Sequence, residues 1–147
     1  NLYTARAYPR EYWNRIALVS EPTGRLLHRA ILEPKGAGFV EKDGWNLLGG
    51  VDEWVGPVDS QVGPDGAVWV ADAANKRALR VREGGEILEE VHAGGLDVIA
   101  CALGGDDGHT LFLCATPDFQ LPPEGAARTQ PARILTCRVD VPHAGRP

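Results

Sequence analysis

Hydrophobic and polar positions over residues 57–92 follow the pattern of four short strands joined by turns. Residues 67–71, AVWVA, form an almost unbroken apolar run, which is typical of a strand covered on both faces. The residues GPDG before this run and GG at 84–85 are turn residues. The first strands are apolar and the last is charged, which is the gradient expected of a β-propeller blade whose outer strand meets water.

Similar patterns flank this stretch on both sides. Residues 65–73, DGAVWVADA, recur as residues 107–116, DGHTLFLCAT, with one inserted residue. Trp69 then falls on Phe112, and this offset of 43 positions matches the roughly 40 to 50 residues of one blade. Upstream, residues 14–31 match residues 75–92, which aligns Leu18 with Leu79. Three complete or partial blades are therefore predicted.

These repeats divide the chain, taken as one domain over residues 1–147, into four segments. They are a partial blade at 14–32, a long glycine-rich loop at 33–56, a full blade at 57–92 and a partial blade at 97–142. The prediction is nine strands, while a propeller needs at least four blades, usually of four strands each. The predicted fold class is therefore an all-β fragment of a β-propeller, about half of a six-bladed ring.

A half-ring has an open hub and two exposed sheet flanks. Exposed apolar flanks favour self-association. We therefore expect the chain to bind itself, as a homodimer or a higher ring in which symmetry-related blades complete the propeller.

Composition narrows the classes of partner. The 147 residues are 44% hydrophobic and 24% charged, as in ordinary soluble domains. A net charge of −5 argues against a nucleic-acid surface, which rests on clustered Lys and Arg. No apolar run approaches the roughly 20 residues that span a bilayer. We expect neither nucleic acid nor membrane as a partner.

Three cysteines, Cys101, Cys114 and Cys137, lie inside predicted strands. An odd number at such positions favours buried, reduced thiols over a disulfide framework or a zinc site. Reduced thiols, with no recognisable signal peptide, favour a cytoplasmic location. None of the four histidines stands in a nucleophile motif, so no catalytic residue is assigned.

Two sets of polar and aromatic residues have alternative interpretations. Trp45 and Trp54, in the predicted long loop, either line a pocket for a small sugar-derived ligand or pin the loop to the body. Asp72 and Asn75 either stabilise the turn after the apolar strand or face a ligand. In both cases the structural role is favoured.

Residues 63–147 resemble the C-terminal part of the gluconolactonase, senescence-marker-protein and regucalcin family of six-bladed propellers. The resemblance rests on GPDGAVWVADAANKRALRVREGGEILEEV, ACALGGDDGHTLFLCAT and ILTCRVDVPHAGRP. Residues 11–72 resemble sugar-dehydrogenase-like propeller domains through YWNRIALVSEPTG, LEPKGAGFVEKDGWNLL and DEWVGPVDSQVGPDGAVWVAD. The two resemblances overlap at GPDGAVWVAD, so the chain is either a divergent propeller or two propeller fragments joined at that strand.

The first resemblance implies one divalent cation (Ca²⁺, Mg²⁺, Mn²⁺ or Zn²⁺) at the channel mouth and hydrolysis of sugar lactones, the ion polarising the carbonyl and activating water. The aspartate that the family uses there aligns with Val58, one residue before Asp59. A shift of one residue turns a strand side chain to the opposite face unless a local bulge restores it. Asp59 is the candidate metal ligand on this basis.

Three functions are therefore considered. The first is a metal-dependent lactone hydrolase. The alternative is a non-catalytic propeller scaffold or binding module that self-assembles into a closed ring. The third is a fragment of a quinone- or haem-linked sugar dehydrogenase, although the sequence supplies no haem-attachment motif.

Overall fold

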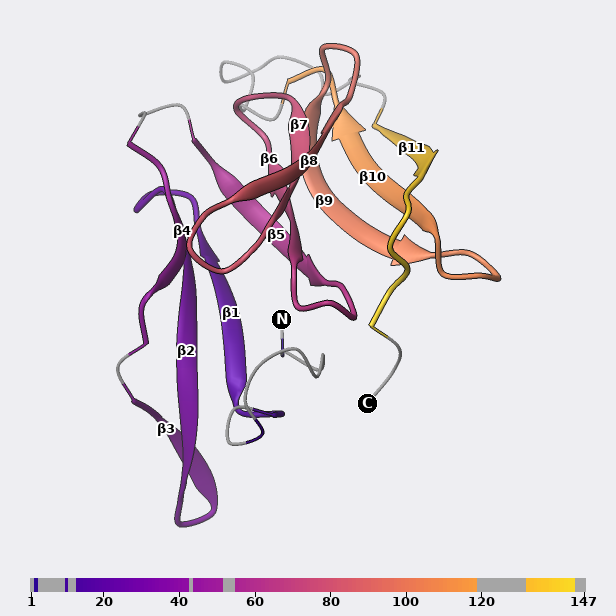
Figure 1. Cartoon of the computed structure of the whole chain (residues 1–147). Coiled ribbons are helices and arrows are strands. Elements are labelled where there is room, and N and C mark those ends of the chain that lie inside the picture. Colours follow the sequence, from indigo (N-terminus) through magenta and orange to yellow (C-terminus); the bar gives the residue numbers. More distant parts are fainter. Residues whose placement is uncertain are drawn as a thin grey trace.

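The computed structural model describes residues 2, 10, 13–42, 44–51, 55–118 and 132–144. Eleven strands and no α-helix occur in these ranges, which confirms the all-β prediction (Figure 1). No helix of the described chain is long and apolar enough to cross a membrane. The strands are β1 (Ile16–Glu21), β2 (Leu26–Lys35), β3 (Gly38–Lys42), β4 (Asn46–Gly49), β5 (Pro57–Val62), β6 (Val68–Asp72), β7 (Arg77–Val81), β8 (Ile87–His92), β9 (Asp97–Gly104), β10 (Thr110–Thr116) and β11 (Arg133–Arg138).

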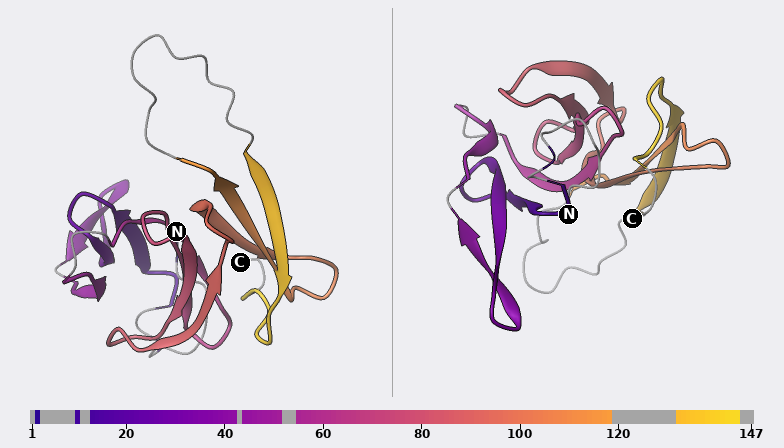
Figure 2. Two further views of the ribbon diagram at one scale, coloured as in Figure 1. Left: turned by 90° about the horizontal axis from the view of Figure 1, so that it is seen from above. Right: turned by 60° about the horizontal axis from the view of Figure 1, so that its bottom comes forward.

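The strands form three antiparallel sheets, which we call the first, middle and last sheet (Figures 1 and 2). In the first sheet β2 lies between β1 on one side and β3 and β4 on the other. The middle sheet is the meander β5-β6-β7-β8 and spans the residues 57–92 that were predicted as a four-stranded blade. The last sheet has the order β9-β10-β11. Edge strand β5 of the middle sheet lies against both β1 and β9.

The middle sheet is covered on both faces. Val68 and Val70 belong to a core cluster shared with Ile16 and Leu18 of the first sheet. Trp69 and Ala71 of the same strand, with the opposite orientation, belong to a second cluster shared with Leu111, Leu113 and Cys101 of the last sheet. All five residues of β6 are buried, as predicted for a strand with a blade on either side.

The predicted loop at 33–56 is wrong in part, because it contains two strands. β2 continues to Lys35 and pairs with β3 across the short turn at Gly36 and Ala37, and β4 follows at Asn46–Gly49. Gly36 has a φ of 60°, a conformation that suits glycine in tight turns. The glycines that suggested an irregular loop thus belong to a hairpin, and the nine predicted strands become eleven.

The last sheet has three strands within the predicted partial blade at 97–142, and residues 119–131 lie outside the described residues. All three cysteines lie in strands and carry free thiols. The prediction of burial is correct for Cys101, while Cys137 is half-buried and Cys114 is exposed. Cys114 differs because it lies on the face of the last sheet opposite the core residue Leu113.

Candidate functional site

Asp59 lies next to a bulge in β5. The pairing of β5 with β6 shifts between Pro57 and Asp59, so Val58 is the extra residue. A bulge allows two successive side chains to point to similar sides of a strand. Val58 packs against the cluster between the middle and last sheets, and Asp59 bonds to the last sheet. The structure therefore contains the irregularity that Asp59 needs to change its direction.

The Asp59 carboxylate contacts the backbone of the neighbouring sheet. Its Oδ2 accepts a hydrogen bond of 3.1 Å from the backbone N–H of Cys101 in β9. Within the described ranges, no group of three or more His, Cys, Asp or Glu side chains lies close enough together to hold a metal ion.

Asp72 and Asn75 stabilise the turn from β6 to β7, the role favoured from the sequence. Asp72 is 1% exposed, and its Oδ1 accepts a hydrogen bond of 3.1 Å from the Gly56 N–H. Its Oδ2 accepts hydrogen bonds from Asn75 Nδ2 at 2.9 Å and from Arg77 Nε at 3.1 Å. Both oxygens are occupied, as a buried carboxylate requires.

The two candidate tryptophans have different outcomes. Trp54 lies outside the described residues. Trp45 directly precedes β4, and the Arg29 guanidinium stands 4.1 Å from the centre of its ring. Arg29 also forms an ion pair with Glu83 of the middle sheet's last turn. This cation–π contact ties Trp45 to the body of the protein.

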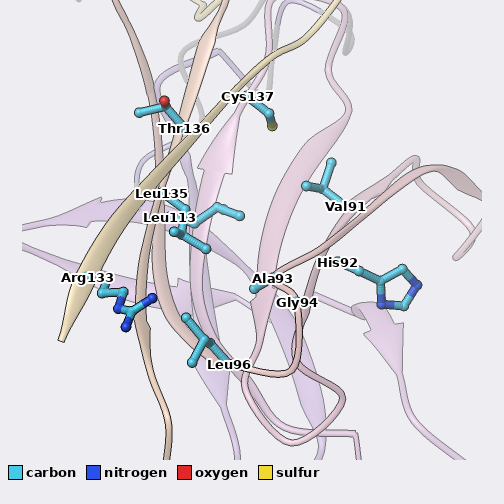
Figure 3. A pocket seen from close by; sticks show the side chains of 10 residues that line it. All are labelled: Val91, His92, Ala93, Gly94, Leu96, Leu113, Arg133, Leu135, Thr136 and Cys137. Atoms are coloured by element: carbon cyan, nitrogen blue, oxygen red, sulfur yellow. The ribbon is translucent and has the colours of Figure 1, made fainter. Parts of the chain in front are cut away.

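A pocket of about 490 Å³ lies between the middle and last sheets (Figure 3). One wall is the end of β8 with the turn that follows it, and the other wall is formed by β10 and β11. Five apolar side chains line it: Val91, Ala93, Leu96, Leu113 and Leu135.

The polar groups around this pocket differ at its two ends. Figure 3 shows the Arg133 guanidinium directed from β11 toward the pocket, whereas the His92 ring points away from it. Within the described part of the chain, Arg133 forms no ion pair. At the other end, burial raises the pKa of the Cys137 thiol, and the nearby Glu89 carboxylate raises it further. The pocket therefore carries a cation at one end and an anion near the other.

The sequence did not predict this pocket. The alternation of Arg133, Leu135 and Cys137 in β11 places the three side chains on one face, which is a recognisable signal. The opposite wall comes from residues some 40 positions earlier, and only the packing of the two sheets brings the walls together.

In a comparison with protein families, residues 1–77 match the model of a domain of unknown function, DUF7133. The matched residues make up more than half of the chain. The chain belongs to the DUF7133 family. The matched part covers the first sheet and the strands β5 and β6.

Among solved structures, a luciferin-regenerating enzyme is similar to this DUF7133 chain, with a TM-score of 0.67 at 14% sequence identity. The alignment covers 88% of this chain and 43% of that chain. At this identity the likeness shows the fold alone, and with the three blade-like sheets it confirms the predicted β-propeller fragment. The search of curated proteins found no match.

Proposed function

We propose that this chain is a propeller binding module whose ligand is a small amphipathic monocarboxylate, held in the pocket between the middle and last sheets. The observation that carries this proposal is the Arg133 guanidinium at a pocket lined by five apolar side chains. A volume of about 490 Å³ is within the range of small-molecule sites. Such sites are mostly apolar and use a few polar groups to orient the ligand.

The charged side chains at the two ends of the pocket indicate the class of ligand. Arg133 forms charge-assisted and often bidentate hydrogen bonds with carboxylates. Glu89, near Cys137 at the other end, disfavours a second anionic group there. The apolar lining favours a hydrocarbon body over the sugar-derived ligand considered as an alternative for Trp45 and Trp54. Each buried Å² of that body contributes about 25 cal/mol.

Calorimetric titration with octanoate tests this function. We expect saturable binding of octanoate by the wild type and a loss of about tenfold or more in affinity for Arg133→Gln, since hydrogen bonds to charged groups contribute about 1.5–3 kcal/mol. The matched control is Arg138→Gln, because Arg138 lies on the same strand and pairs with Asp107. Arg138→Gln should bind as the wild type does.

Octan-1-ol separates the carboxylate from its apolar body. It should bind at least about tenfold more weakly than octanoate, because it gives Arg133 no anionic partner. Equal affinity for the two compounds, or equal affinity of wild type and Arg133→Gln for octanoate, would contradict the proposal.

Metal-dependent hydrolysis of sugar lactones is the second candidate function. The bulge at Val58 favours it, because it lets Asp59 reach the edge where β5 meets β9. Gluconolactone hydrolysis should be measured with added Ca²⁺, Mg²⁺, Mn²⁺ or Zn²⁺ and again with EDTA. Turnover that EDTA abolishes and that Asp59→Asn lowers would support this activity; turnover at the uncatalysed rate would count against it.

A further inference from the structure

The outer face of the last sheet carries an apolar patch beside the exposed polar residue Thr136. Cross-strand pairs place Cys114 with Ala100 and Ile134, and Phe112 with Ala102, on the side opposite the core residues Leu111 and Leu113. Ile134 is 71% exposed, and Cys114 and Ala102 are exposed as well. We call these five residues, Ala100, Ala102, Phe112, Cys114 and Ile134, the outer face of the last sheet.

The internal repeat shows what this face corresponds to. Phe112 aligns with Trp69, and each lies on the second strand of its sheet. Trp69 is 1% exposed because the last sheet packs over it. Phe112 is turned toward the position that a following blade would occupy. The last sheet therefore presents the kind of surface that the middle sheet buries.

The first sheet has an exposed face at the opposite end of the stack. Ile16, Leu18 and Leu27 point to the middle sheet. Val19 pairs with His28 on the other side, and Phe39 pairs with Pro34 along the same strand β2. Val19 is 50% exposed and Phe39 is 68% exposed. We call Val19, His28, Pro34 and Phe39 the outer face of the first sheet.

We propose that a second copy of this chain covers both faces. The outer face of the last sheet in one copy packs against the outer face of the first sheet in the other copy. A two-fold axis through the hub produces the same contact twice, which closes six sheets into one ring. No apolar sheet end then remains exposed.

The packing of the sheets within the chain favours a second copy over an unrelated partner. The same head-to-tail packing already occurs twice within the chain, first sheet on middle sheet and middle sheet on last sheet. The two free ends are therefore the two complementary halves of one repeated interface.

Light scattering after size-exclusion chromatography tests the ring at tens of micromolar protein. We expect a particle with twice the 15.8 kDa of one chain. Ile134→Glu and Val19→Glu should each give a folded monomer, because each places a charge in both contacts. Ile87→Glu is the matched control, since Ile87 is 51% exposed but lies on β8 of the middle sheet; it should remain a dimer. A wild-type monomer, or an open series of larger species, would overturn the proposal.

Labelling of Cys114 gives a second readout that does not depend on the size of the particle. In the ring, the partner's first sheet covers Cys114, so a maleimide should label it at least about tenfold more slowly than in Val19→Glu, as local protection predicts. Peptide mapping distinguishes Cys114 from Cys101 and Cys137. Equal labelling rates at Cys114 in folded wild type and Val19→Glu would overturn the proposal.

The ring and the ligand pocket are tested separately. The pocket lies between the middle and last sheets, and Val19 lies on the far side of the first sheet. Monomeric Val19→Glu should therefore still bind octanoate. A wild-type monomer that binds octanoate would contradict the ring alone. A dimer that does not bind octanoate would contradict the binding function alone.

Discussion

Asp59 and Cys101 are joined by a hydrogen bond of 3.1 Å across the edges of two sheets, although they lie 42 positions apart in the chain. The donor is the Cys101 backbone N–H, in a residue that is 4% exposed. Water is therefore poorly placed to replace the carboxylate as acceptor. The side chain considered as a metal ligand thus has a structural role between β5 and β9.

Replacing Asp59 should destabilise the fold. Asp59→Ala leaves a buried N–H without its acceptor, which lowers the free energy of unfolding by about 1–3 kcal/mol. Asp59→Asn keeps an acceptor oxygen, so its free energy of unfolding should fall by less than that of Asp59→Ala. Urea denaturation measures both, and Asp106→Ala, at an exposed turn residue, is the matched control expected to unfold as the wild type does. Equal midpoints for Asp59→Ala and Asp106→Ala would refute the structural role.

Trp69 offers a test of the repeat. Its ring is 1% exposed, and its Nε1 has no hydrogen-bond partner within the described residues. Trp69→Phe removes this unsatisfied donor, keeps an aromatic ring and introduces the residue found at the equivalent position, Phe112. It should cost less than about 1.5 kcal/mol, whereas Trp69→Ala should cost about 3–5 kcal/mol through the cavity it leaves. Thermal or urea unfolding of the two variants measures both losses of stability. Similar losses for Trp69→Phe and Trp69→Ala would argue against the equivalence of Trp69 and Phe112.

The middle sheet could be predicted because short stretches of its sequence indicate both its strands and its turns. The apolar run of β6 is consistent with burial on both faces. The residues at its ends are types that occur preferentially in turns. The β2–β3 hairpin was missed because glycine-rich composition is common to loops and to tight turns. Only the cross-strand pairing of Pro34 with Phe39 distinguishes them, and that pairing is not visible in one strand alone.

The candidate site was less predictable than the fold. A bulge was recognised as the condition for reorienting Asp59, yet no residue type signals a bulge at Val58 in advance. The pocket beside Arg133 depends on the distance between two sheets, which is set by long-range packing. Sequence patterns report the face on which Arg133 lies, and they contain no information on what lies opposite.

The β2–β3 hairpin should be sensitive to its turn glycine. Gly36 has a φ of 60°, and a Cβ at this position would meet no atom within 4 Å. Any loss in Gly36→Ala therefore comes from the backbone conformation, at about 1 kcal/mol or slightly more. Gly36→Asn should lose less, because asparagine tolerates this conformation. Urea denaturation of both variants provides the comparison; a more stable alanine variant would be inconsistent with the hairpin.

Stability should fall at alkaline pH because of Cys101. Burial raises the pKa of this thiol, and the charge of Asp59 adds to the effect. In the unfolded chain the thiol loses its proton near pH 8.5, while in the fold it stays protonated. A pKa raised in the folded state gives stability that is complete below the unfolded pKa and is lost as pH rises. The free energy of unfolding should therefore decrease above about pH 8.5, by at most about 1.4 kcal/mol per pH unit from this group.

The variant Cys101→Ala isolates this contribution. It should be less stable than the wild type at pH 7, since it leaves a small cavity in the core. Its loss relative to the wild type should then shrink between pH 8 and pH 10, because the wild type alone carries the titrating thiol at this position. Val98→Ala, which also leaves a cavity in this core but removes no titrating group, serves as the control and should keep the wild-type slope. Parallel curves for wild type and Cys101→Ala would mean that the thiol is accessible to ionisation in the fold.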